Sequence, residues 1–193
     1  DLSKKINTAV FPGYQGGPLM HIIAAKAAGF LEALQPDFKD YVKSVLVNAK
    51  ILSETLKNNG FKIYSGGTDT HLMLVDLRPF NVKGNLAAES LSRANITCNK
   101  NGIPFDSESP MITSGIRLGS QAATTRGFGL KEFEKVGELI TKVIEGLSKN
   151  PDDNGKIEDE VRKEVVSLCS SFPIYKNLRK WFAQYAKKEK LQL

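Results

Sequence analysis

Little in this sequence points to a membrane, a metal or a disulfide framework. It contains no run of about 18 apolar residues, so we expect no transmembrane helix and no membrane partner. Residues 1–5 lead into a polar segment rather than the apolar stretch of a signal peptide, so we expect a cytoplasmic protein. The two cysteines, Cys98 and Cys169, match no metal-binding or redox spacing. This pattern favours buried thiols in a reducing compartment and no metal site.

Positive charge is in excess, but the excess lies at one end of the chain. The formal net charge is +6 over 193 residues. Residues 176–193 contain six basic side chains and one acidic one, so they contribute +5 and the rest of the chain only about +1. We therefore expect no nucleic-acid partner. The segment also places apolar side chains on one helical face, and this face favours docking against the parent fold over a membrane-surface or partner helix, because it is barely two turns long.

The order of hydrophobic patterns predicts a mixed α/β chain. Hydrophobic residues make up 41% of the sequence and charged residues 25%, an ordinary balance for a globular core. Helical spacing is found in residues 19–34, 38–56, 83–94, 130–147 and 157–168, and strand patterns in residues 61–64, 71–76, 96–98 and 115–118. We expect a domain of long helices over 1–60, a small α/β sandwich with helices on one face over 61–175, and a basic amphipathic tail over 176–193.

A glycine-rich loop precedes the first long helix. Residues 7–18 contain three glycines and two prolines, too many turn formers for a regular element. Backbone N–H groups at Gly16 and Gly17, just before a helix, suit an anion such as phosphate, although Gly-Gly-Pro also occurs in plain loops. The helix itself is apolar nearly all round, which predicts burial. His21 within it is therefore interpreted as a core histidine bonded to a neighbouring carbonyl.

Residues 95–117 carry the strongest functional pattern. A short strand at 96–98 runs into an irregular polar loop, which ends in Thr-Ser-Gly-Ile-Arg. Strand alternation turns Arg117 away from the face of Ile116 and Leu118. A guanidinium beside a glycine suits two-point capture of a carboxylate, and the alternative is a solvated arginine at a strand end. Because the loop has a strand on each side, we expect a functional loop rather than a disordered one.

Four motifs together resemble the serine hydroxymethyltransferase family of fold-type I pyridoxal-phosphate enzymes. They are VFPGYQGGPLMH at 10–21, YSGGTDTHLMLVDL at 64–77, RANITCNKN at 93–101 and SPMITSGIRLGSQAATTRGF at 109–128. The similarity extends over residues 4–175. Met111 stands where the family often has an aromatic residue, and Gln121 where a proline is usual. The resemblance implies a C-terminal portion: the helical end of a large cofactor domain followed by a small α/β domain.

The resemblance also implies a role for each motif. Gly16 and Gly17 would give backbone amides to the phosphate of pyridoxal 5'-phosphate, across the interface of a homodimer or higher homo-oligomer. Arg117 would hold the amino-acid carboxylate. Asn101 and Ser109-Pro110-Met111 would contact the folate. The implied reaction interconverts serine and glycine, with transfer of the hydroxymethyl carbon to tetrahydrofolate.

The same resemblance shows what this chain lacks. The family's cofactor-binding lysine, the partner of the pyridine nitrogen, the stacking aromatic and the proton-transfer glutamate have no matching position here. No catalytic residue is therefore assigned, and we expect this chain to be inactive alone. Two alternatives stay open: another fold-type I enzyme, such as an aminotransferase or aldolase, and a non-catalytic small-domain module.

Overall fold

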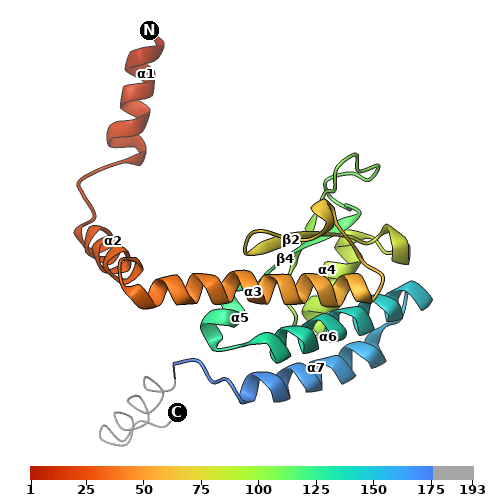
Figure 1. Cartoon of the computed structure of the whole chain (residues 1–193). Coiled ribbons are helices and arrows are strands. Elements are labelled where there is room, and N and C mark those ends of the chain that lie inside the picture. The colour runs from red at the N-terminus through yellow and green to blue at the C-terminus, as the bar shows by residue number, and fades with distance from the viewer. Residues whose placement is uncertain (176–193) are drawn as a thin grey trace, which may run out of the picture. The chain divides into compact units, whose positions relative to one another are not determined.

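The computed structural model describes residues 1–175 and divides the chain into two compact units, Asp1–Asp40 and the part from Tyr41 onward (Figure 1). The boundary falls within one long helix, α3 (Pro36–Asn58). The proposed division of the whole protein at residue 60 stays a prediction. The amphipathic tail at 176–193 lies outside the described residues.

The first unit is helical. It contains α1 (Leu2–Thr8), a wide helical turn η1 (Ala9–Tyr14), α2 (Met20–Ala33) and the start of α3. The Asp1 side chain caps α1 by accepting a hydrogen bond from the Ser3 N–H at 3.0 Å. The prediction of an irregular loop from residue 7 is wrong as far as Tyr14, because helical backbone continues to that residue apart from Phe11. Irregular backbone begins only at Gln15, just before the two glycines.

The prediction that α2 is buried is wrong for this chain. No residue of α2 is buried, and Phe30 and Leu34, which follow its apolar pattern, are 69% and 80% exposed. His21 is exposed as well, so the interpretation as a core histidine is also wrong. The physical reason is that a single helix cannot cover its own apolar surface, and no residue in 1–40 is buried.

The second unit is built on a four-stranded antiparallel sheet in the order β1-β2-β4-β3. Its strands are β1 (Lys62–Ile63), β2 (Leu72–Asp76), β3 (Asn99–Asn101) and β4 (Gly115–Gly119). The predictions for β2 and β4 are confirmed within one residue. The strand predicted at 61–64 is shorter, because Tyr64 begins the 3-10 turn η2 (Tyr64–Gly66).

The strand predicted at residues 96–98 is wrong, since β3 begins only at Asn99. Asn95 adopts a left-handed backbone conformation (φ 64°) and turns the chain out of the preceding helix. The Ile96 N–H then bonds to the Leu91 carbonyl at 2.8 Å, which ties this residue to the helix end rather than to the sheet.

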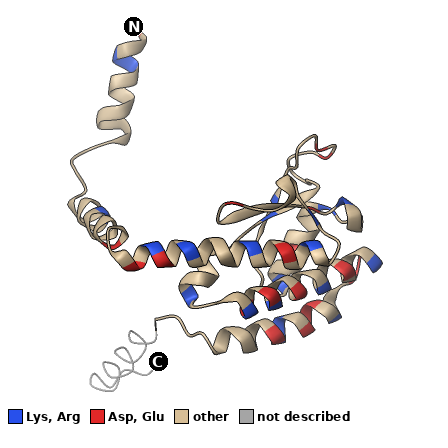
Figure 2. Ribbon diagram, in the orientation of Figure 1, with Lys and Arg blue, Asp and Glu red and all other residues tan. Residues whose placement is uncertain are grey.

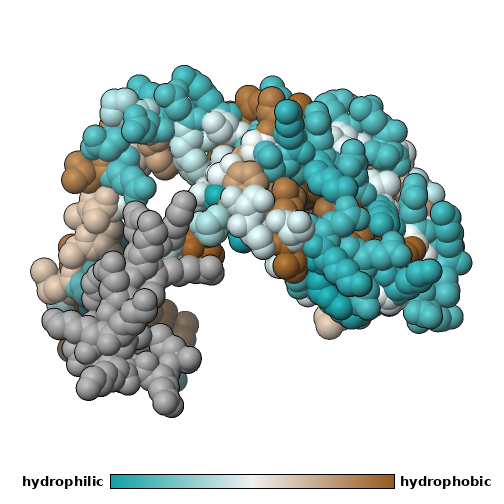
Figure 3. Space-filling view, turned by 90° about the horizontal axis from the view of Figure 1, so that it is seen from below, coloured by the Kyte–Doolittle hydropathy of each residue, from teal (hydrophilic) through white to brown (hydrophobic). Residues whose placement is uncertain are grey.

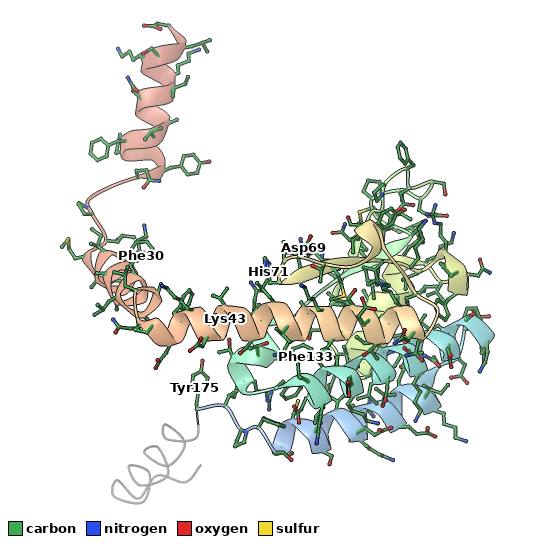
Figure 4. The ribbon with its side chains drawn as sticks, viewed as in Figure 1. Phe30, Lys43, Asp69, His71, Phe133 and Tyr175 are labelled. Carbon is green, nitrogen blue, oxygen red and sulfur yellow. The ribbon has the colours of Figure 1, made fainter. Side chains whose placement is uncertain are left out.

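Helices cover one face of the sheet, as expected for the small α/β layer structure (Figure 1). Besides α3 they are α4 (Gly84–Arg93), α6 (Leu130–Lys149) and α7 (Gly155–Ser170), with the shorter η3 (Arg78–Phe80) and α5 (Gln121–Arg126) between elements. Their apolar side chains meet the sheet residues Met73, Val75, Ile116 and Leu118 in one core. Phe133 of α6 is among the most deeply buried side chains in that core (Figure 4). Arg117 lies on the opposite face of β4, away from this core.

The outer surfaces of the helices carry charges of both signs. Acidic and basic residues are interspersed along α3, α6 and α7 (Figure 2), and the helical side of this unit is mostly hydrophilic (Figure 3). The Lys142 Nζ of α6 lies 3.1 Å from the Glu160 Oε2 and 3.4 Å from the Glu164 Oε1 of α7. Among residues 1–175, no helix combines the length and apolarity that crossing a membrane requires.

Candidate carboxylate and pterin site

Arg117 lies at the middle of β4, the strand that pairs with neighbours on both sides. It is opposite Leu74 of β2 and Asn99 of β3. Its neighbours Ile116 and Leu118 are buried, whereas Arg117 is exposed on the other face, as strand alternation predicted. Within residues 1–175 its guanidinium makes no hydrogen bond or ion pair. The central strand β4 therefore presents an unpaired guanidinium that can donate two parallel hydrogen bonds.

An open groove of about 690 Å³ surrounds this guanidinium. The polar residues that line it with Arg117 are His71, Thr97, Asn99 and Gln121. His71 lies just before β2 (Figure 4), and Gln121 is the first residue of α5. A cation flanked by amide and hydroxyl groups is suited to binding a carboxylate with further polar groups beside it.

Cys98 also borders the groove but offers no nucleophile. Burial raises the pKa of its thiol to about 11, so the thiol stays protonated at neutral pH. The groove is consequently suited to binding rather than to covalent chemistry by the groups that line it. The sequence pattern predicted buried thiols, and Cys98 and Cys169 are both only partly buried.

Asn101 lies on the same face of the sheet as Arg117. It pairs with Gly115, two residues before Arg117 on β4, and side chains two residues apart on a strand share a face. The Asn101 side-chain nitrogen donates to the Gly102 carbonyl at 2.8 Å. That bond shapes the turn after β3 and gives Asn101 a local structural role.

The loop from 102 to 114 holds the other three residues expected to contact folate. Ser109, Pro110 and Met111 are exposed, and Met111 is 73% accessible. The Ser109 carbonyl accepts the N–H groups of Ile112 and Thr113 at 2.9 and 3.0 Å, so these residues form a closed turn. The sequence-predicted residues on β3, on this loop and on β4 therefore belong to one continuous segment between two paired strands.

Gly115 allows this segment to approach the sheet closely. A Cβ at this position would lie 2.6 Å from Ile103 Cγ2, 2.7 Å from the Val75 carbonyl oxygen and 3.0 Å from the Asn101 carbonyl oxygen. Those separations are shorter than van der Waals contact. Glycine is therefore needed here for packing, as its place in the Ser-Gly-Ile-Arg motif suggested.

Gly16 and Gly17 lie in the first unit, whose placement relative to the second is not determined. A Cβ at either glycine would meet nothing within 4 Å, so the backbone is open to a ligand. The residue that caps α2, Leu19, has no side-chain acceptor for the first N–H groups of the helix. These features fit a phosphate held by backbone amides.

Sequence patterns alone did not identify His71, Thr97, Asn99 and Gln121 as groove residues. The available signal for Asn99 was its spacing of two from Asn101, which places both on one face of a strand. His71 stands at the start of an apolar strand, and Gln121 follows the strand that carries Arg117. Neither position has a distinctive pattern of its own, because strand pairing rather than sequence spacing brings them together.

Comparison with known proteins identifies the family. The serine hydroxymethyltransferase family model matches residues 1–140. The chain is 88% identical over 179 residues to serine hydroxymethyltransferase of Pelagibacter ubique, covering 93% of this chain and 41% of that protein. It is 62% identical over 176 residues to the protein of the same name from a Marinomonas species. That match covers 91% of this chain and 41% of the Marinomonas protein. The chain spans about 41% of the length of these relatives, and it belongs to the serine hydroxymethyltransferase family.

Proposed function

We propose that this chain supplies the substrate-carboxylate site and the folate contacts of an enzyme that interconverts serine and glycine. In the full-length protein the hydroxymethyl carbon of serine would pass to tetrahydrofolate. The observation that carries the proposal is the unpaired guanidinium of Arg117, held on a central strand on the same sheet face as Asn101. Membership of the family supports the reaction class.

Arg117 contributes orientation rather than bond chemistry. A planar guanidinium binds a carboxylate through two parallel hydrogen bonds, which fix both the position and the rotation of the amino acid. Because β4 pairs with β2 over five residues and with β3 over three, the strand holds the guanidinium firmly. Which bond of the substrate reacts is then decided by how it is held.

The loop contributes the second substrate. A side-chain amide can both donate to and accept from the polar edge of a pterin, and Asn101 lies on the same sheet face as Arg117. Pro110 and Met111 offer apolar surface for the flat ring and would exclude water from it. This loop is what separates the proposal from an aminotransferase or aldolase, neither of which needs a folate contact.

Pyridoxal 5'-phosphate, when bound, would supply the electron sink for the reaction. In this chain, the backbone amides of Gly16 and Gly17 are the groups that would hold its phosphate, in a homodimer or higher homo-oligomer. The exposed apolar surface of α2 is consistent with such an assembly, because 48% of Ile23 and 69% of Phe30 are accessible here.

Substitution of Arg117 by lysine in the full-length enzyme tests the proposal. Lysine keeps the charge but loses the planar fork. The loss is expected to be on the order of 2–4 kcal/mol, or roughly 30- to 1000-fold in kcat/KM for serine. Cofactor affinity should be unchanged, because the cofactor is held elsewhere.

Arg162→Lys is the matched control. Arg162 is half-exposed on α7, where it pairs with Asp159 one turn away and donates to the Arg93 carbonyl. Its replacement should leave kcat/KM for serine within about twofold. Equal, small effects of the two substitutions would show that Arg117 is only a solvated strand residue.

A further inference from the structure

Asp106 occupies the centre of the loop that joins β3 to β4. Its Oδ2 accepts the Ile103 N–H at 3.1 Å and the Ser114 N–H at 2.9 Å. Its Oδ1 accepts the Glu108 N–H at 3.0 Å and the Ser114 hydroxyl at 2.7 Å. One carboxylate therefore joins the start, the middle and the end of the loop.

These bonds require the ionised form of Asp106. Burial raises the pKa of this carboxyl, but the Ser114 hydroxyl and three backbone N–H groups outweigh it and hold that pKa well below its usual range. No basic side chain among residues 1–175 forms an ion pair with Asp106. Arg78 attracts this carboxylate electrostatically without forming an ion pair with it. The four hydrogen bonds to Asp106 therefore all come from neutral donors of the loop itself.

The far side of the loop is held by the first turn of α4. The N–H groups of Gly84 and Asn85 donate to the carbonyls of Thr113 and Ile112, each at 2.9 Å. A Cβ at Gly84 would come within 2.5 Å of the Gly115 carbonyl, so only glycine permits this contact. The turn that contains Ser109-Pro110-Met111 lies in the chain between Asp106 and the residues that bond to α4, Ile112 and Thr113.

We propose that Asp106 is the positioning residue of the pterin loop: it holds Asn101 and the turn at 109–111 in their binding geometry without touching the ligand. The inference rests on the proposed folate function of this loop. Arg117 does not depend on Asp106 in the same way, because its strand is held by pairing to β2 and β3. Loosening the loop should therefore harm folate use while sparing the carboxylate site.

Asp106→Asn in the full-length enzyme tests this. The amide keeps the size of the side chain but turns one acceptor into a donor facing N–H groups. The KM for tetrahydrofolate should rise by about tenfold or more, while kcat at saturating folate and folate-independent cleavage of allo-threonine change less than about threefold. Amide hydrogen exchange of peptide 102–114 should be faster than in the parent enzyme.

Asp153→Asn is the matched control. Asp153 is exposed and also accepts a backbone N–H, from Gly155 at 3.2 Å, but far along the chain before α7. In that variant the KM for tetrahydrofolate, kcat, the cleavage of allo-threonine and the hydrogen exchange of peptide 102–114 should all be unchanged. If Asp106→Asn does not fold, Ser114→Ala, which removes only one of the four donors, should give a smaller rise in the same KM.

The outcomes separate the inference from the function on which it rests. An unchanged KM for folate, equal losses in both reactions, or a raised KM without faster exchange in 102–114 would each overturn the positioning role. Asn101→Ala is measured in parallel. If it raises the KM while Asp106→Asn does not, only the role of Asp106 fails, and if neither substitution affects folate use, the folate assignment itself fails.

Discussion

At the scale of single residues, close approach and unpaired charge explain the Ser-Gly-Ile-Arg motif. Gly115 lets Ile103 and two carbonyl oxygens come within 3.0 Å of where a Cβ would stand. Arg117, two residues later, has no partner among residues 1–175. The glycine is needed for packing, and we propose that the arginine serves binding, although both lie on one face of one strand.

Gly115→Ala should therefore destabilise the chain by about 1–3 kcal/mol, because the added methyl group forces β3 and the loop away from β4. Gly119→Ala is the control on the same strand and face, where the nearest atom to a Cβ is the His71 carbonyl oxygen at 3.4 Å. It should cost about 0.5 kcal/mol or less. Urea unfolding followed by circular dichroism measures both, and equal midpoints would contradict the steric account.

At the scale of elements, a buried network joins α4 to α7. Glu158 is 3% exposed and accepts hydrogen bonds from the Ser90 hydroxyl at 2.6 Å and from Arg93 at 2.7 Å. Asn154 donates to Ser90 and to the Val143 carbonyl of α6, so three helices meet here. The hydrogen bond and charge of Arg93 lower the pKa of Glu158, against the opposing effect of burial.

Glu158→Gln should destabilise the chain by about 1–3 kcal/mol, since Arg93 loses its charge partner but remains half exposed to water. The folded-state pKa lies below the unfolded one, so the ionised carboxylate stabilises the fold above about pH 4.5 and this contribution is lost as the pH falls through the folded value.

The difference in free energy of unfolding between the parent chain and Glu158→Gln, measured by urea unfolding, should consequently shrink below about pH 4. Glu160→Gln, at an exposed ion pair with Lys142, should change stability by less than about 1 kcal/mol. A difference for Glu158→Gln that stays constant from pH 7 to pH 3 would exclude a contribution from its charge.

The sequence predicted most elements of the second unit because their patterns agree with their surroundings. The alternation through residues 72–76 and 115–119, and the helical spacing through 130–147, reflect one face packed on the core. It misplaced β3 because Ile96 and Thr97 have the side chains of a strand, whereas the residues that pair with β4, Asn99–Asn101, are polar. The roles of Asp106 and Gly84 could not be predicted, because both depend on contacts across loops.

At the scale of the whole molecule, the first unit has no core of its own among the described residues. No residue of 1–40 is buried, although α2 has the composition of a core helix. The chain covers about 41% of its curated relatives. The apolar surface of α2 and the open backbone at Gly16 and Gly17 are suited to contacts that these residues alone do not make.

We therefore expect the isolated 193-residue chain to have no hydroxymethyltransferase activity and to bind no pyridoxal phosphate covalently. The lysine motif expected from the family is absent from it. Borohydride reduction with cofactor, followed by peptide mass analysis, provides the measurement. A stable label on any lysine of this chain, together with turnover of serine, would show that the chain is catalytic by itself.

We propose that Arg117 and Asn101, on one face of one sheet, bind two different substrates. Asn101→Ala in the full-length enzyme, with both reactions measured on the same sample, tests it most directly. Folate-dependent conversion of serine should lose about 1–3 kcal/mol of transition-state stabilisation, because a pterin polar group is left unpaired. Folate-independent cleavage of allo-threonine, which needs the cofactor and Arg117 but not the pterin contact, should stay near its parent rate. Equal losses in both reactions would show instead that Asn101 only shapes the turn after β3 through its bond to Gly102.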